Sequence, residues 1–528
     1  MPSAKAKVSA DESAEEKQDG KYFKLWRRFY EPLVLLKILG STRGKHSPAL
    51  REHKRYRFLE NLAYICDRDK GGHTTSAVGL EEAFDGFKFW IACNSPKETA
   101  KGIPFLKATL RAARDIADLP TDEKSTPERE LIQKCSEYAR LRIKKEATML
   151  MRDIDKCMSF LTSPRDANLS VWLERFREKE FLEICYLAYH GRHTRLMKEL
   201  SARIQRHDDL SNRDKQSETI SDLIHRLGRL AHHIRAPKEI IEDISDCQHL
   251  RNVVDEFEVH SVKPQPIIVR PEADPNIKMS HIINRMLPNR AASRSRYEEA
   301  GAIMNQKFNI EDRFKEHFND KNFKPVMHAE IQVLEHFWTE KLRFFDDDRY
   351  IGCSKPACYC CHLYIQHHPA KCVVPQTSRK VYLNWGLRAL PEGSLDLDYT
   401  LQRDMLNKMV EWIRNDALAQ IEKKTSAAPS HPDSQTGITG HAWSVFNEAH
   451  EPDRDKPLAE TLARLDLGAG VSGMVENAND IQWADADNYA SDSSHLLASS
   501  SDASIQGSHD VSGVDYEDSD SSDGGASL

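Results

Sequence analysis

The sequence predicts a multidomain α+β protein with an all-helical domain over 21–245, a mixed α/β domain over 250–424 and a disordered acidic tail over 425–528. The chain has 528 residues, which is too long for one ordinary hydrophobic core. Helical apolar periodicity with little proline or glycine fills the first half, and strand-like runs begin only near Val253. From Ser426 onward, Ser, Asp, Gly and Ala dominate and the periodicity fades.

The all-helical domain is predicted from repeated apolar spacing and has no evident chemistry of its own. Residues 1–20 look disordered, and helical spacing begins at Tyr22. Thr126 as N-cap and Pro127 as the first helical residue announce one of the later helices. The further helical patterns cover 50–66, 78–93, 109–117, 131–158, 171–189, 195–204 and 220–233.

The mixed α/β domain is predicted from strands that precede and then alternate with helices. Strand character appears over 253–262 and 267–269, with Pro264 and Pro266 separating the two runs as a turn would. An arginine-rich loop over 285–296 follows. The later expected elements are helices over 297–308, 331–338 and 401–413, a helix that carries Cys358 and Cys361, and short strands over 350–353 and 380–384.

Charge is distributed unevenly along the chain. The formal net charge is −7, but residues 465–528 contain thirteen Asp or Glu and no Lys or Arg, so the remainder carries +6. A mildly positive body is compatible with a phosphate-bearing substrate. The acidic tail is either a solubilising disordered segment, an intramolecular competitor for such a ligand, or, like the helical domain, a place where a protein partner docks.

Membrane insertion and secretion are not expected. Leu33–Leu36 is a run of only four strongly apolar residues, far short of the roughly 20 that span a bilayer. The segment from Met1 to Lys21 is charged and lacks the apolar stretch of a signal peptide. We therefore expect the cytoplasm or the nucleus, where cysteines are thiols or metal ligands rather than disulfides.

His328 and Glu330, followed by Cys358 and Cys361, offer three zinc ligands and one proton carrier. A catalytic zinc takes about three protein ligands and keeps a fourth position for water, which one imidazole and two thiolates allow. The pKa of water bound to such a zinc falls from about 16 to about 7, so hydroxide is available as the nucleophile. The residues therefore predict a hydrolytic deaminase in which Zn²⁺ is held by His328, Cys358 and Cys361, and Glu330 is the catalytic proton shuttle.

The spacing of these residues is compatible with one shared metal. Cys358 and Cys361 are three positions apart, which places both sulfurs on one face of a helix near its start. Thiolates at a helix start are stabilised by the exposed N–H groups there. His328 and Glu330 converge only if His328 lies at a junction between loop and helix, and Pro325 just upstream favours such a junction.

The motif His328-x-Glu330, with the run from Ser354 to Cys361, resembles the cytidine-deaminase-like zinc deaminase superfamily, and more narrowly its OTT-type branch. The likeness covers roughly 250–420 and implies a three-layer α/β/α fold with a five-stranded mixed sheet. It also implies the same three ligands, the same proton shuttle and a nucleobase, in a nucleotide or a nucleic acid, as the substrate. Many members place proline directly before the first cysteine, whereas Pro356 lies two positions ahead here, so the resemblance does not carry over a specific base.

Several alternatives accompany this prediction. A closed four-sulfur zinc site would leave no open coordination position, and the protein would then be a catalytically inactive, zinc-stabilised interaction module. The four sulfurs of this closed site would come from Cys353, Cys358, Cys361 and Cys372. Cys360 is expected in the core.

Other side chains near the motif could also contribute. The alternative histidine ligands are His336, His362, His367 and His368. The aromatic residues that could stack on a base are Tyr359, Tyr364, Tyr382 and Trp385.

Overall fold

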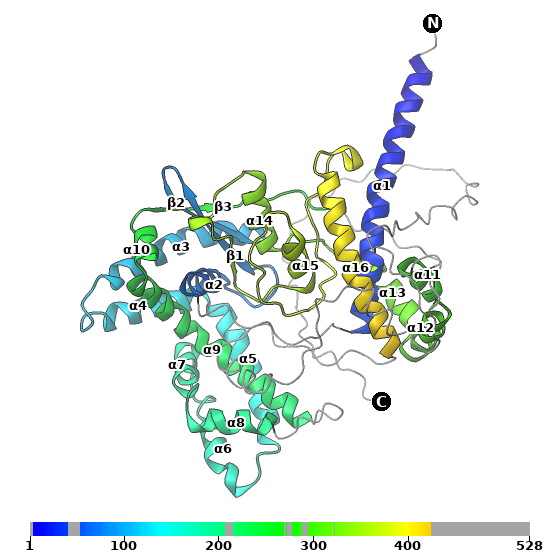
Figure 1. The fold of residues 1–528 in the computed structure, drawn as a ribbon. Coiled ribbons are helices and arrows are strands. Elements are labelled where there is room, and N and C mark those ends of the chain that lie inside the picture. Colours follow the sequence, from blue (N-terminus) through cyan, green and yellow to red (C-terminus); the bar gives the residue numbers. More distant parts are fainter. Residues whose placement is uncertain are drawn as a thin grey trace, which may run out of the picture.

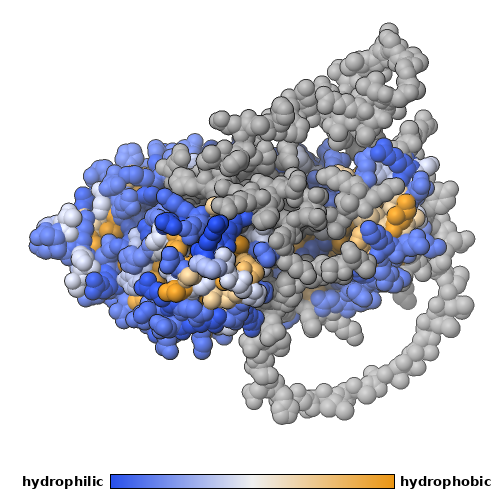
Figure 2. All heavy atoms as spheres, turned by 90° about the horizontal axis from the view of Figure 1, so that it is seen from below, coloured by the Kyte–Doolittle hydropathy of each residue, from blue (hydrophilic) through white to orange (hydrophobic). Residues whose placement is uncertain are grey.

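The computed structural model describes residues 4–40, 53–205, 215–268, 271, 277–287, 294–320 and 323–423. The predicted acidic tail over 425–528 lies outside these residues. Within the described part of the chain, no helix combines the length and the apolar character needed to cross a lipid bilayer. Figure 2 shows that hydrophilic residues cover most of the described surface on the face it presents, with small hydrophobic areas between them.

Helices dominate the fold, and the strands gather into one sheet (Figure 1). Short 3₁₀ turns at Pro164–Asp166, Phe345–Asp347 and Gly393–Leu395 complete the regular structure. The strands are β1 (Ser76–Ala83), β2 (Gly86–Cys93), β3 (Phe257–Ser261) and β4 (Ile351–Cys353). The helices are α1 (Ala4–Leu39), α2 (Lys54–Cys66), α3 (Pro96–Ala117), α4 (Ser125–Tyr138), α5 (Arg140–Met158), α6 (Ala167–Glu174), α7 (Phe181–Gly191), α8 (Arg195–Gln205), α9 (Lys215–Asp246), α10 (Gln248–Asp255), α11 (Met279–Met286), α12 (Arg294–Phe308), α13 (Ile310–Asn319), α14 (Ala329–Thr339), α15 (Tyr359–His367) and α16 (Tyr399–Lys423).

The prediction of a helical N-terminal region is confirmed, with differences in detail. The run predicted over 131–158 is two helices, because α4 ends at Tyr138 and α5 begins at Arg140. Thr126 lies inside α4 rather than at its cap. Helix α1 begins at Ala4 and so includes most of residues 1–20, whose predicted disorder stays a prediction.

The helix predicted over 78–93 is wrong, because this segment forms the β1–β2 hairpin. Neighbouring residues of β1 enter different hydrophobic cores: Ala77 joins the core that contains α14, whereas Val78 joins the core that contains α2. Both faces of the strand are therefore buried, and the alternation of apolar and polar residues that identifies a half-exposed strand is missing. The available signal was Asp85 followed by Gly86: Asp85 lies in the turn, and Gly86, which pairs with Ala83 at the start of β2, has φ +129°, which favours glycine.

The sheet is mixed and combines strands that are far apart in the sequence. Its order is β3-β2-β1-β4, with β1 antiparallel to both β2 and β4, and β2 parallel to β3. Among the described residues it has four strands rather than the five that the resemblance implies. Two of them precede residue 250, so the sheet does not form within 250–424 alone.

Helices lie on both faces of this sheet. The core on one face contains Phe58 of α2 and Leu110 of α3, and the core on the other contains Ile331 of α14. Helix α14 approaches β1 closely at Gly79, where an added Cβ would lie 2.7 Å from Val333 Cγ1. The helix that carries the predicted site is thus fixed directly on the central strand.

A third core belongs to the helices between the hairpin and β3. Helices α5, α7, α8 and α9 bury apolar side chains such as Leu150, Ile184, Leu200 and Leu227 against one another. In Figure 1 these helices extend away from the sheet as a separate group. In sequence order they stand between strands β2 and β3 of the same sheet.

The strand expectations of the second half are met in part. Strand β4 agrees with the short strand predicted over 350–353, and β3 with the end of the run over 253–262, whose first residues belong to α10. Over 267–269, Ile267 makes one isolated bridge to Arg388, and Val269 lies outside the described residues. The strand predicted over 380–384 is wrong, because its backbone makes no ladder: Lys380 O accepts one hydrogen bond from the start of α15, and Asn384 O accepts one from Val326, ahead of α14.

Candidate metal centre

The three predicted ligands lie at the starts of two helices. His328 is the N-cap residue of α14, with the extended backbone angles φ −65° and ψ 149°. Cys358 is the N-cap residue of α15, with φ −71° and ψ 169°, and Cys361 follows in the first turn. The prediction that His328 occupies a junction between loop and helix is therefore confirmed.

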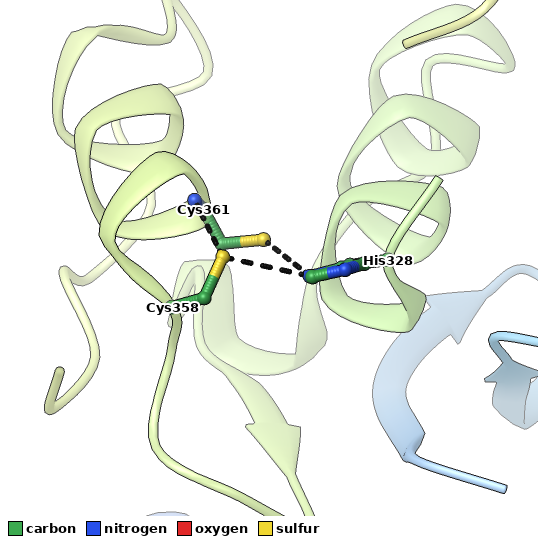
Figure 3. A group of neighbouring side chains, drawn as sticks. All are labelled: His328, Cys358 and Cys361. Atoms are coloured by element: carbon green, nitrogen blue, oxygen red, sulfur yellow. Dashed lines mark hydrogen bonds between the residues drawn. The ribbon is translucent and has the colours of Figure 1, made fainter. Parts of the chain in front are cut away.

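The ligand atoms face one another (Figure 3). His328 Nδ1 lies 3.5 Å from Cys358 Sγ and 3.3 Å from Cys361 Sγ. A nitrogen about 2.1 Å and a sulfur about 2.3 Å from one tetrahedral zinc would lie roughly 3.6 Å apart, close to both distances. All three atoms lie within 4.8 Å of one another, and no other group of three such ligands is found in the described part of the chain. The cluster therefore fits one divalent metal ion, and its one imidazole and two sulfurs suit zinc.

The segment wrongly predicted as a strand explains why the two helix starts converge. Lys380 O accepts a hydrogen bond from Tyr359 N at 2.9 Å, at the first residue of α15. A few residues on, Asn384 O accepts from Val326 N at 2.6 Å, and Gly386 N donates to Val326 O at 3.0 Å, just before α14. One short segment thus joins the start of α15 to the residues that lead into His328.

Asn94, at the end of the hairpin, supports the other side of the site. Its Oδ1 accepts a hydrogen bond from Ala329 N at 2.8 Å, which satisfies a free donor at the start of α14. Its Nδ2 donates to Gly72 O at 2.7 Å. The sequence interpretation missed this residue, because its position directly after a strand becomes visible only once the hairpin is recognised.

Glu330 lies in the first turn of α14, two residues after His328, and is only 4% exposed. Burial raises the pKa of its carboxyl group above the ordinary value, although His328 nearby opposes this shift. Cys353 Sγ lies 3.8 Å from Glu330 Oε2. A buried carboxyl with a raised pKa is suited to accept and return a proton near neutral pH.

The two cysteines respond differently to their surroundings. Burial disfavours both thiolates, yet the hydrogen bond from Cys361 and the charge of His328 hold the pKa of Cys358 well below its usual value. Burial and the neighbouring Cys358 raise the pKa of Cys361 well above the usual value. Two adjacent thiolates repel each other, and a divalent cation between them is what stabilises both in deprotonated form.

The alternative ligand sets do not assemble. Neither Cys353 nor Cys372 belongs to the cluster, so the closed four-sulfur site is not formed among the described residues. Cys360, between the two candidate ligands, is fully buried in the core. The other histidines have different neighbours: His336 packs on Trp90, His367 on Trp412 and His368 on Tyr364 and Glu335, and burial lowers the pKa of His362 to about 4.

Of the four aromatic residues considered for base stacking, Tyr382 is the accessible one. It is 38% exposed, and its ring lies 6.0 Å from the His328 ring at an interplanar angle of 70°. Tyr359 and Tyr364 are buried, and their hydroxyl groups donate to Asp416 and Glu335. Trp385 is 0% exposed, and its Nε1 donates to Cys361 Sγ at 3.2 Å. Trp385 thus supports a ligand instead of a base, a role that its sequence position did not reveal.

We expect Trp385→Phe to weaken zinc binding about tenfold, because it removes the N–H donor that orients and stabilises the Cys361 sulfur. The measurement is the zinc dissociation constant from competition with a chromophoric chelator. Trp338→Phe is the matched control, since Trp338 is 41% exposed on α14 and makes no contact with the sulfurs. Equal zinc affinity in the Trp385→Phe variant and the unaltered protein would contradict this role.

Other polar features lie away from the metal cluster. The arginines of the predicted loop over 285–296 lie in helices where they are described: Arg285 of α11 pairs with Glu31, Arg296 of α12 pairs with Glu422, and Arg294 of α12 donates to Asn284. Arg290 lies outside the described residues. Two small cavities beside α14 share Glu335, Thr339 and Arg388 in their linings and include none of the candidate ligands.

The comparisons with known proteins agree with this geometry. No curated protein and no solved structure matches the chain. Residues 327–389 match the model of a family described as OTT_1508_deam-like deaminase, and the match contains His328, Glu330, Cys358 and Cys361. The segment over 327–389 is therefore similar to a deaminase family of the cytidine-deaminase-like kind, and it contains the His/Cys/Cys cluster that fits zinc.

Proposed function

We propose that the protein is a zinc-dependent hydrolytic deaminase that acts on a nucleobase in a nucleotide or a nucleic acid. The observation that carries the proposal is that His328 Nδ1 lies within 3.5 Å of both Cys358 Sγ and Cys361 Sγ, near the buried Glu330. The deaminase family match over 327–389 supports the same reaction class.

The chain's own residues take distinct parts in this reaction. His328, Cys358 and Cys361 would hold zinc, which as a Lewis acid makes a water molecule reactive near neutral pH. Glu330 takes a proton from the attacking water and delivers protons to the ring nitrogen and then to the departing amine. Water is added at the amidine carbon, the carbon–nitrogen bond breaks, and ammonia leaves.

Tyr382 supports the choice of a flat heteroaromatic substrate. Its ring is exposed beside His328, so a base bound at the metal can stack on it. The proposal that the substrate is a nucleotide or a nucleic acid rests on this surface and on the family resemblance. A protein partner bound through the helical region or the acidic tail, and a location in the cytoplasm or nucleus, stay predictions.

The organisation of the fold is also part of the proposal. We infer that the deaminase unit is made of α2, the hairpin, α3, β3, β4, α14 and α15, with helices on both faces of the sheet as in the three-layer fold that the resemblance implies. Helices α4–α9 are then an insertion within this unit, since β2 and β3 pair across them.

The test measures zinc per chain and ammonia release from a panel of free bases, nucleosides, nucleotides, single-stranded DNA and single-stranded RNA. We expect about one zinc per chain and ammonia release from at least one member. Removing the metal with a chelator should abolish ammonia release, and adding zinc back should restore it. The reason is that water becomes a nucleophile near neutral pH only when a metal ion lowers its pKa. Zinc binding without ammonia release from any member would favour the inactive interaction module, and a protein without stoichiometric zinc would contradict both.

A further inference from the structure

A network of buried charges connects the helical group to the segment that leads into Cys358. Asp67, directly after α2, has a fully buried side chain, and its Oδ2 lies 3.2 Å from Arg142 Nη1 of α5. Arg142 Nε lies 3.3 Å from Glu146 Oε1, and Arg229 Nε of α9 lies 2.7 Å from the same oxygen. These four side chains are at most 4% exposed, so each charge depends on its partners for compensation.

Asp67 is the end of this network nearest the metal site. Its Oδ2 accepts a hydrogen bond from Ser354 Oγ at 3.1 Å and lies 3.9 Å from Lys355 Nζ. Its Oδ1 accepts from Thr74 Oγ1 at 2.6 Å. Burial alone would raise the pKa of Asp67, but Arg142 and Lys355 lower it below the ordinary value, which keeps the carboxylate charged.

Ser354 and Lys355 belong to the short connection between β4 and Cys358. Ser354 N donates to Ser76 O at 2.9 Å, and Ser354 Oγ accepts from Ser76 N at 3.2 Å, so the start of this connection is attached to β1. Lys355 Nζ donates to Gly71 O at 3.0 Å. Ser354 and Lys355, at the start of the connection, are therefore held by the loop between α2 and β1, whereas Ala357 is bonded to residues 376–378.

The same loop contacts Asn94, which supports the helix start at the other ligand. Gly72 O accepts from Asn94 Nδ2, and Asn94 Oδ1 accepts from Ala329 N directly after His328. One loop, residues 67–75, thus contacts the supports of both helix starts. A displacement of Asp67 would alter the separation between the imidazole and the sulfurs, to which metal affinity is sensitive.

We propose that Asp67 is a positioning residue for the metal centre, through which the buried charges of helices α5 and α9 fix Ser354 and Lys355 and so help to hold Cys358 opposite His328. This inference rests on the proposed zinc site and gives the helical insertion a role in it. It does not depend on the identity of the substrate.

The test uses Asp67→Asn and Ser354→Ala in the full chain, with Asp243→Asn as the matched control. Asp243 of α9 is likewise a buried carboxylate paired with an arginine, but its partner is Arg57 of α2 rather than the segment 354–358. The measurements are the zinc dissociation constant by chelator competition, the d–d absorption bands of the cobalt-substituted protein, and the thermal unfolding midpoint.

We expect Asp67→Asn to weaken zinc binding about tenfold or more and to change the cobalt bands, because the ligand geometry relaxes. Asp243→Asn should lower the unfolding midpoint without changing either metal readout. Ser354→Ala should weaken zinc binding in the same direction, and the double variant should lose less affinity than the product of the two single losses, since Ser354 and Asp67 contact each other directly and hold the same segment.

Unchanged zinc affinity and cobalt bands in both site variants would overturn the proposal, and so would an equal loss of affinity in the Asp243→Asn control. If Asp67→Asn does not fold, Ser354→Ala decides alone, because it removes only one hydroxyl group. Zinc binding by the unaltered protein is measured first. A protein that binds zinc but releases no ammonia would refute the proposed activity and leave this test intact, whereas a protein that binds no zinc would refute both.

Discussion

Replacing Glu330 with Gln is expected to reduce ammonia release by about 10²–10⁴-fold while zinc content stays the same. The amide keeps the shape of the side chain, but it can neither accept the proton from water nor return it to the leaving amine. Glu330 is not one of the clustered ligands, so the metal should remain bound. The measurement is the initial rate of ammonia release with the best member of the substrate panel, together with zinc per chain.

Glu335→Gln is the matched control, because it makes the same substitution on the same helix. Glu335 accepts a hydrogen bond from Tyr364 Oη at 2.7 Å and lies 3.1 Å from His368 Nε2, outside the metal cluster. We expect its variant to retain zinc and most of the activity. Retained activity in the Glu330→Gln variant would remove Glu330 from the reaction.

Replacing Gly352 with Ala is expected to lower the free energy of unfolding by about 3 kcal/mol or more. Gly352 is the middle residue of β4, and an added Cβ would lie 2.3 Å from Leu59 C and 2.5 Å from Leu59 O of α2. These are backbone atoms inside a helix, so they cannot rotate away as a side chain can. The helix and the strand must separate, and the next residue, Cys353, begins the approach to the metal site.

The measurement is urea unfolding followed by circular dichroism, with Gly72→Ala as the control. An added Cβ at Gly72 meets nothing within 4 Å, so this variant should unfold within about 0.5 kcal/mol of the unaltered protein. If the two variants are equally stable, the close packing of α2 on β4 is wrong.

The candidate site was predictable from sequence because its chemistry is local. His328 and Glu330 share the start of one helix, and Cys358 and Cys361 share the start of another, so residue type and spacing define each half. Proline upstream of His328 indicated the junction that the N-cap position now shows. The meeting of the two halves required only that two helix starts approach each other.

The supports of the site were not predictable, because they come from distant parts of the chain. Asn94, Asp67 and Trp385 contact residues that are distant in sequence, and none of these contacts follows from local spacing. A lone buried tryptophan or aspartate carries no spacing signal. The long-range pairing that places these residues depends on tertiary structure, which local periodicity does not encode.

The errors in the strand predictions have a common physical origin. The hairpin lacks the alternation typical of a half-exposed strand because both its faces are buried, whereas the segment 380–384 has this alternation, with buried Val381 next to exposed Tyr382. Alternating burial is necessary for a half-exposed strand, but a ladder also needs a neighbouring strand to pair with. The segment has the alternation without the partner, and the hairpin has the partners without the alternation.

The pairing of Ala77 with Cys353 has a consequence for biosynthesis. The partner of β1 is translated far downstream, and at about 5–20 residues per second the delay is on the order of tens of seconds. Throughout this interval the nascent hairpin presents an unsatisfied edge, the kind of surface on which growing chains stick to one another. The pairing of β4 with β1 therefore completes the sheet only after residues 351–353 have emerged from the ribosome.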